Sequence, residues 1–182
     1  MTEVAKKDRT WLYVGLTFIV FWGFYLAVLN PGLTDQPPDL ENTTPTLSAD
    51  FGWVLETLDG KSVSLADYKG RPIVLNLWVT WCPPCRKEMP SLVALAAHPE
   101  LSKVAFLGVT TEKPTGVVKS YAQDEMKGMT VLRSEDVPGV FKTDGIPATF
   151  IISPDGKILV SQVGTAKWDD PSVVNLLKLL VK

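Results

Sequence analysis

The chain has 182 residues, 46% of them hydrophobic, and its formal net charge of −2 provides no basic field that would attract nucleic acid. Two cysteines and one histidine also leave few soft ligands for a metal site. The composition divides the chain into a short charged head, one apolar stretch and a remainder of ordinary globular character.

The apolar stretch follows the charged head, residues 1–10. Residues 11–29 contain no charged side chain, and a helix of that length is roughly 28 Å long, close to the hydrocarbon thickness of a bilayer. Aromatic residues lie near both ends of the stretch, and Asn30-Pro31-Gly32 ends the helix. A cleaved signal peptide would be shorter and would end in small residues, whereas Phe24 to Leu29 is bulky. We therefore expect an uncleaved transmembrane anchor over residues 11–29.

Basic residues precede this anchor and acidic residues follow it. Lys6, Lys7 and Arg9 lie before the apolar stretch, and the next basic residue after it is Lys61. The asymmetry predicts a single-pass protein of a bacterial cytoplasmic membrane, with a cytoplasmic N-terminus and a periplasmic or otherwise extracytoplasmic remainder. Residues 30–50, rich in Pro, Thr and Asp, are expected to form a linker with little reason to fold.

From residue 51 onward, short β-type runs alternate with helical patterns, which predicts one α/β domain over residues 51–182. Turn residues at Asp59-Gly60 and Pro154-Asp155-Gly156 indicate two antiparallel hairpins. The expected strands are residues 51–58, 61–65, 73–79, 104–110, 130–133, 148–153 and 157–163. The expected helices are residues 82–97, 114–126 and 169–181.

The only two cysteines, Cys82 and Cys85, lie where the apolar strand 73–79 gives way to a helix. Two intervening residues put both sulfurs on the first helical turn, close enough to form a disulfide. The unpaired N–H groups and the dipole of a helix N-terminus favour a thiolate at the first cysteine. The pattern therefore predicts a redox-active pair in which Cys82 attacks and Cys85 resolves.

A cysteine pair with this spacing can also be half of a zinc site or a structural disulfide. Zinc needs about four ligands, and the chain offers no third cysteine and one histidine, His98, at the expected end of a helix. A structural bridge across so short a loop would remove little entropy from the unfolded chain. Redox chemistry explains the pair better than either role.

Several motifs in a fixed order resemble those of a known family. The strand Val74 to Trp78 runs into WCPPC and CPPCRKEMP, and it is followed later by Gly145 to Ile152 and by Asp155 to Ile158. Together with the apolar N-terminal stretch and the first hairpin, these motifs resemble the TlpA/ResA-like membrane-anchored thiol:disulfide oxidoreductases. The resemblance implies a thioredoxin-like α/β fold, with a mixed central sheet flanked by helices, an N-terminal β-hairpin and one transmembrane anchor helix.

The same resemblance implies which residues lie on the substrate side of the cysteine pair. Pro147 would follow a cis peptide bond and lie against the sulfurs, leaving the backbone of Ile146 free to pair with an extended substrate chain. The alternative for Pro147 is an ordinary turn proline that opens a strand. The other residues expected on this side are Trp81, as an apolar wall, and Pro83 and Pro84, which stiffen the loop.

The chain has Asn76 at a position where thioredoxin itself carries a buried aspartate. Asparagine cannot take up a proton, so another group must exchange protons with the cysteine pair. The narrower family has a glutamate three residues after the second cysteine, and Glu88 matches it, one helical turn from Cys85. We expect Glu88 to exchange protons there; the alternative is a solvated helix carboxylate beside Arg86 and Lys87.

These inferences predict a membrane-tethered enzyme that reduces protein disulfides and needs no metal and no cofactor beyond its own Cys82–Cys85 disulfide. The resemblance implies that its clients are cysteines of apocytochrome c or of copper-site assembly factors, and that a transmembrane electron donor recharges the pair. A copper-delivery module would need further soft ligands. A peroxiredoxin-like peroxidase would carry Pro-x-x-x-Thr-x-x-Cys, where this chain has Leu75 and Val79.

Overall fold

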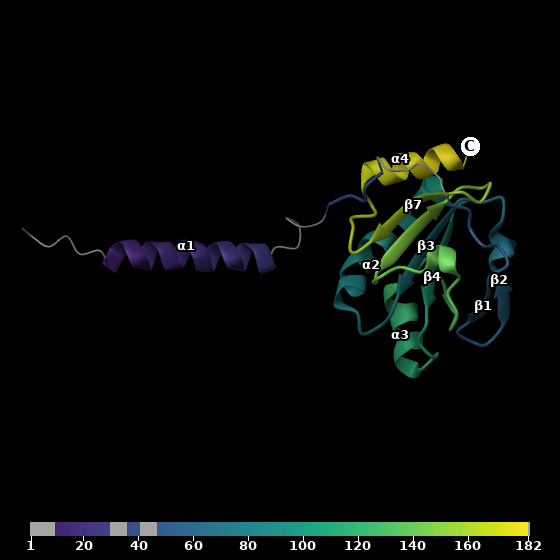
Figure 1. Ribbon diagram of the computed structural model, residues 1–182, viewed down its shortest axis with the longest axis horizontal. Helices are drawn as coiled ribbons and strands as arrows, with labels where there is room; N and C mark the ends of the chain where they lie inside the picture. The colour runs from purple at the N-terminus through teal and green to yellow at the C-terminus, as the bar shows by residue number, and fades with distance from the viewer. Residues whose placement is uncertain (1–9, 30–35, 41–46, 182) are drawn as a thin grey trace, which may run out of the picture. The chain divides into compact units, whose positions relative to one another are not determined.

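The computed structural model describes residues 10–29, 36–40 and 47–181, and the chain divides into two compact units, residues 1–35 and 36–182 (Figure 1). In the first unit, helix α1 spans Thr10–Leu29, as the uncharged stretch predicts. Over the part of the chain that the structure describes, no helix combines the length and the hydropathy needed to cross a bilayer. The anchor therefore stays a prediction.

A mixed sheet forms the frame of the second unit. Among the described residues it has seven strands in the order β2-β1-β5-β4-β3-β6-β7. The strands are β1 (Val54–Thr57), β2 (Ser62–Ser64), β3 (Ile73–Trp78), β4 (Ala105–Thr110), β5 (Thr130–Arg133), β6 (Ala148–Ile152) and β7 (Ile158–Val163). Strands β3, β4 and β5 are parallel, whereas both hairpins pair antiparallel with them at the two sides. This arrangement is the thioredoxin-like fold with an N-terminal β-hairpin that the motifs imply.

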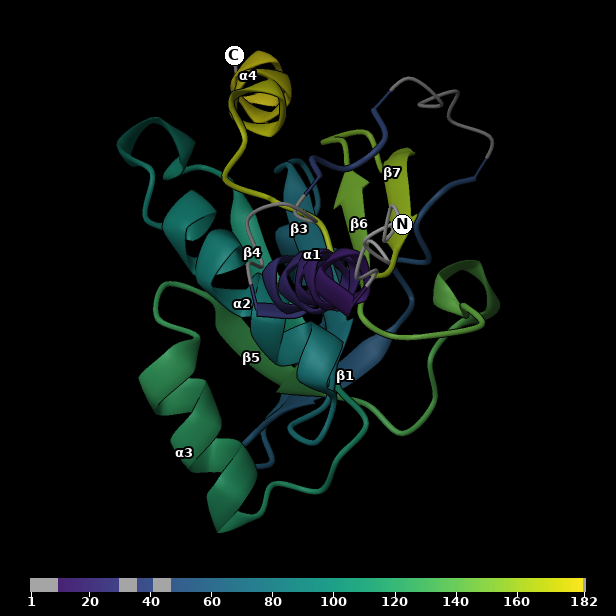
Figure 2. The same cartoon turned by 90° about the vertical axis from the view of Figure 1, so that its left-hand side faces the viewer.

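Helices cover one face of the sheet together with one short 3-10 turn, and two further 3-10 turns cover the other face. The helices are α2 (Pro83–Ala96), α3 (Gly116–Glu125) and α4 (Pro171–Leu180), and the turns are η2 (Leu65–Tyr68), η3 (Pro99–Leu101) and η4 (Gly139–Phe141). Figure 2 shows α2 in front of the central strands. One core cluster contains Met89, Val118 and Leu177 from the three helices, and a second cluster contains Leu65 and Phe141 from η2 and η4.

Strand β3 connects both clusters because all six of its residues are buried. Side chains alternate between the faces of a strand, so Val74 and Trp78 belong to the helix-side cluster, while Ile73, Leu75 and Leu77 belong to the other. The same alternation directs Asn76 toward α2. A polar side chain is thereby placed in the core directly below the helix that carries the cysteines.

Two stretches of the predicted linker, residues 36–40 and 47–50, pack against the rest of the second unit. Pro38 is buried, and Leu40 packs against the helix-side cluster. The backbone contacts are Lys167 N–H to Gln36 O at 2.9 Å, Ala49 N–H to Gly156 O at 2.8 Å, and a bridge between Ser48 and Lys157. The expectation that the linker has little reason to fold is wrong for these stretches. Residues 30–35 and 41–46 lie outside the described part of the chain.

Candidate active site

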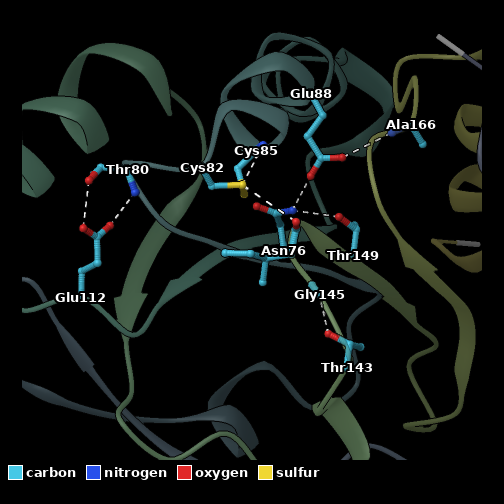
Figure 3. The surroundings of a disulfide bond; sticks show 11 residues. Asn76, Thr80, Cys82, Cys85, Glu88, Glu112, Thr143, Gly145, Thr149 and Ala166 are labelled. Carbon is cyan, nitrogen blue, oxygen red and sulfur yellow. Dashed lines mark hydrogen bonds between the residues drawn. A yellow bond between two sulfur atoms is a disulfide. The ribbon is translucent and has the colours of Figure 1, made fainter. Parts of the chain in front are cut away.

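Cys82 and Cys85 are joined by a disulfide bond at the N-terminus of α2, with their Cα atoms 5.3 Å apart (Figure 3). Cys82 is the N-cap residue, and its Sγ accepts a hydrogen bond from the N–H of Cys85 at 3.2 Å. Pro83 and Pro84 begin the helix, where a missing N–H leaves no helical bond unmade. Cys82 is 4% exposed and Cys85 0%, so Cys82 is the sulfur nearer to solvent.

The loop before β6 faces the disulfide. The Ile146–Pro147 peptide bond is cis, as the resemblance implies, and the carbonyl oxygen of Ile146 lies 3.9 Å from Cys82 Sγ. Thr143 Oγ1 donates to the carbonyl oxygen of Gly145 at 2.8 Å and so orders the loop (Figure 3). Ile146 remains 37% exposed. The loop therefore presents an apolar side chain and a backbone edge beside Cys82.

Trp81 projects into solvent beside the cysteine pair rather than packing over it. Its side chain is 71% exposed. It borders an open groove of about 690 Å³ between α2 and α3, which Arg86, Val117 and Tyr121 also line. The guanidinium of Arg86 lies 5.8 Å from the centre of the Tyr121 ring. The apolar wall expected of Trp81 is therefore one side of a surface groove.

A mostly apolar cavity of about 290 Å³ lies on the other side of the Ile146 loop. Its walls come from the C-terminal ends of β3 and β4 and from the segment 137–146. Phe141 of η4 is one of its lining residues. Ile146 belongs to the rim of this cavity and Trp81 to the groove, so apolar surface flanks the cysteine pair on two sides.

Glu88 is buried in the core, only 2% exposed, although its neighbours Arg86 and Lys87 are exposed. Its Oε1 accepts from Asn76 Nδ2 at 2.7 Å, and its Oε2 accepts from Trp168 Nε1 at 3.1 Å. Burial raises the pKa of Glu88 from 4.5 to about 7, although the hydrogen bonds that it accepts partly oppose this increase. The alternative of a solvated helix carboxylate is therefore wrong.

Asn76 connects Glu88 to β6. Its Nδ2 donates to Thr149 Oγ1 at 2.8 Å as well as to Glu88, while its buried Oδ1 has no hydrogen-bond partner among the described residues (Figure 3). Asn76 and Thr149 are paired in register between β3 and β6. The network places a carboxyl group that titrates near neutral pH one helical turn from Cys85, with an amide where thioredoxin has its aspartate.

Comparison with known proteins agrees with this geometry. Residues 41–161 match the sequence model of the AhpC/TSA family. The thiol-disulfide oxidoreductase ResA of Geobacillus thermodenitrificans is 33% identical over 122 residues, which cover 65% of this chain and 69% of the relative. The chain belongs to the AhpC/TSA family and is a ResA-like thiol-disulfide oxidoreductase of the thioredoxin superfamily.

Two further likenesses cover more of this ResA-like chain. ResA of Bacillus subtilis is 26% identical over 164 residues, 89% of either chain. A crystal structure described as a thiol-disulfide oxidoreductase from Bacteroides vulgatus has a TM-score of 0.63 and 26% identity, and the match covers 77% of this chain and 99% of that one.

Three residues of the ResA-like site were missed by the sequence analysis. Thr149 could have been found from the pairing of its strand with β3. Glu112, whose carboxylate accepts from the N–H and the hydroxyl of Thr80 close to Cys82, follows the C-terminal end of a parallel strand, where polar functional residues often lie. Trp168 has no local signal, because its contact with Glu88 joins residues far apart in the sequence.

Proposed function

We propose that this oxidoreductase reduces disulfides in client proteins outside the cytoplasm. The observation that carries the proposal is the Cys82–Cys85 disulfide at a helix N-terminus, with the Ile146 carbonyl oxygen 3.9 Å from Cys82 Sγ. An extended client chain can pair with the free backbone edge of that loop while its own cysteine meets Cys82. Exposed apolar side chains, Trp81 and Ile146, would contact the client on either side.

The chemistry begins with the reduced pair. The Cys82 thiolate attacks a client disulfide, so that one client sulfur bonds to Cys82 and the other leaves as a thiolate. Cys85 loses its proton and attacks Cys82 Sγ, which re-forms the Cys82–Cys85 disulfide and releases the client's second sulfur. Two electrons pass to the client without any cofactor, and a transmembrane electron donor would return two. Glu88, with a pKa of about 7, would exchange the proton that Cys85 loses.

The two prolines between the cysteines support a reducing role. Pro83 and Pro84 occupy the first two helical positions and carry no N–H, so fewer donors are available to stabilise a thiolate at the helix end. A strongly oxidising pair depends on a well stabilised reduced thiolate. We infer that the pair is not a strong oxidant. The clients that the family resemblance implies are cysteines of apocytochrome c or of a copper-site assembly factor.

The extracytoplasmic placement rests on the N-terminal region. Helix α1 carries no charged residue, and three basic residues precede it. The likeness to ResA of Bacillus subtilis covers 89% of this chain. The unmatched residues are too few to include everything up to the end of α1, so the likeness extends into that helix. A reporter enzyme fused after Lys182 tests the placement: activity of an extracytoplasmic reporter is expected, and activity of a cytoplasmic one would contradict it.

The enzymatic proposal is tested by comparing three activities of the reduced full-length chain. We expect reduction of insulin disulfides, with peroxide consumption and copper binding no greater than those of a variant that carries both Cys82→Ser and Cys85→Ser. The peroxidase pattern is replaced by Leu75 and Val79, whose side chains are buried and apolar. Peroxide turnover that exceeds insulin reduction, or tight stoichiometric copper binding, would contradict the proposal.

A further inference from the structure

Glu112 binds the turn that leads into the cysteine pair. Its Oε2 accepts from the N–H of Thr80 at 2.5 Å, and its Oε1 accepts from Thr80 Oγ1 at 2.9 Å (Figure 3). Its own N–H donates to Thr110 Oγ1 at 3.2 Å, at the end of β4. Two hydrogen bonds from one residue to the two oxygens of one carboxylate also fix the geometry between the two residues. Glu112 is therefore fixed to the end of β4 through its backbone, and it holds Thr80 with both oxygens of its carboxylate.

Strand register explains why these two residues meet. Trp78 and Thr110 are the last paired residues of the parallel strands β3 and β4. Thr80 and Glu112 each come two residues later, so both chains leave the sheet side by side. The contact therefore ties the exit of β3 to the exit of β4, although 32 positions separate the residues.

The turn that Glu112 holds carries Trp81 and Cys82, two of the groups that would contact a client protein. The N–H of Cys82 donates to the carbonyl oxygen of Val79 at 3.3 Å, which closes a turn over residues 79–82. Thr80 is the second residue of this turn, and exposed Trp81 follows it. Thr80 and Trp81 both line the groove between α2 and α3. Because Glu112 holds the Thr80 peptide, one contact fixes both the orientation of the Trp81 side chain and the path by which a client reaches Cys82.

We propose that Glu112 is a positioning residue for exchange with protein clients: it holds the 79–82 turn so that Trp81 and Cys82 face the client as one surface. The inference rests on the proposed action on protein disulfides. A client chain must contact Trp81 and the Ile146 loop at once, whereas a small disulfide needs only Cys82. Loss of the clamp therefore affects the two kinds of substrate differently.

The test compares kcat/KM for insulin with kcat/KM for hydroxyethyl disulfide in full-length Glu112→Gln. Glutamine keeps the size of the side chain but turns an amide N–H₂ toward one of the two donors of Thr80. We expect kcat/KM for insulin to fall about tenfold, mainly through KM, because a bond to a charged group is lost and the reacting groups are displaced. The value for the small disulfide should change by less than about twofold.

Two matched controls accompany this variant. Thr80→Ser keeps both donors, so the ratio of kcat/KM for insulin to kcat/KM for the small disulfide should stay close to that of the wild type. Glu56→Gln breaks an ion pair with Arg133 on the hairpin side of the sheet. This variant should leave kcat/KM unchanged for both insulin and the small disulfide. Thr80→Val removes only the hydroxyl donor, so it should give a smaller loss for insulin. The double variant Glu112→Gln with Thr80→Val should be no worse than Glu112→Gln alone.

Each contrary result has its own meaning. Equal losses for insulin and the small disulfide, or no loss for either, would overturn the role of Glu112. If Glu112→Gln does not fold, Thr80→Val carries the same test, and unselective kinetics in that variant would overturn the role. Wild-type protein that exchanges with the small disulfide but not with insulin would overturn the proposed function itself.

Discussion

The family resemblance identifies Glu88 as a carboxyl group of the site, but the surroundings of this side chain come from distant parts of the chain. The position three residues after Cys85 places it on the face of the helix that turns inward. Trp168 and Ala166, from the segment before α4, donate to its Oε2. The resemblance therefore predicts the residue, while its burial and its raised pKa depend on tertiary contacts that no local pattern contains.

This burial predicts a pH dependence of stability. The pKa of Glu88 is about 7 in the folded protein and 4.5 when the group is solvated, so the folded state holds the proton more tightly. The stability from this group is complete below pH 4.5 and is lost as the pH rises through about 7. The loss amounts to about 3 kcal/mol. Glu88→Gln should lack this slope in denaturant titrations of the disulfide form, and parallel pH profiles would contradict the prediction.

The same carboxyl group should influence the thiols of the reduced protein. Ionisation of Glu88 above about pH 7 places a negative charge one turn from Cys85 and disfavours its thiolate. Glu88→Gln should therefore shift the alkylation of Cys85 to lower pH. Glu125→Gln, an exposed change on α3, is the control. Superimposable alkylation curves for wild type and Glu88→Gln would leave Glu88 as a buried structural group.

At the scale of elements, the sequence patterns predict the order and type of every strand and α-helix from residue 51 onward, but they misplace the ends of most of these elements. The strand expected at 51–58 is β1, Val54–Thr57, since the chain turns at Phe51 and Gly52. The helix expected from Pro114 begins at Gly116 because Thr115 is its N-cap. Caps and turns are made by single side chains, so periodicity does not locate them.

Helix α4 offers a direct test of how an element is held. Leu177 is fully buried in the helix-side cluster, whereas Leu179 on the same helix is 66% exposed. Leu177→Ala should lower the free energy of unfolding by about 3 kcal/mol through lost burial and the cavity that it leaves. Leu179→Ala should change it by less than about 0.5 kcal/mol. Equal effects in urea titrations would contradict the packing of α4 described above.

At the scale of the whole molecule, composition separates the N-terminal helix from the domain but misses what the intervening residues do. Pro, Thr and Asp predict a stretch without a core of its own. Residues 36–40 nevertheless attach to the segment before α4 and residues 47–50 to the edge beside β7. A few backbone hydrogen bonds and one buried proline suffice for this, and composition contains no signal for them.

Two truncations of different length separate the contribution of residues 1–30 from that of residues 36–40. Removal of residues 1–30 should leave a folded domain with unchanged insulin reduction, because the contacts of Gln36, Pro38 and Leu40 remain. Removal of residues 1–46 should lower the free energy of unfolding by about 1–3 kcal/mol, since those contacts are lost. Urea titrations of the two proteins measure the difference, and equal midpoints would show that residues 36–40 contribute nothing.

The central claim is that Cys82 attacks the client and Cys85 releases it. The most direct measurement is the yield of mixed disulfides, resolved by non-reducing electrophoresis and mass spectrometry, in cells that produce Cys82→Ser or Cys85→Ser. Cys82 is the sulfur nearer to solvent and lies beside the Ile146 loop. We therefore expect client proteins linked through Cys82 in Cys85→Ser and none in Cys82→Ser. Linked clients in Cys82→Ser and their absence in Cys85→Ser would contradict the account.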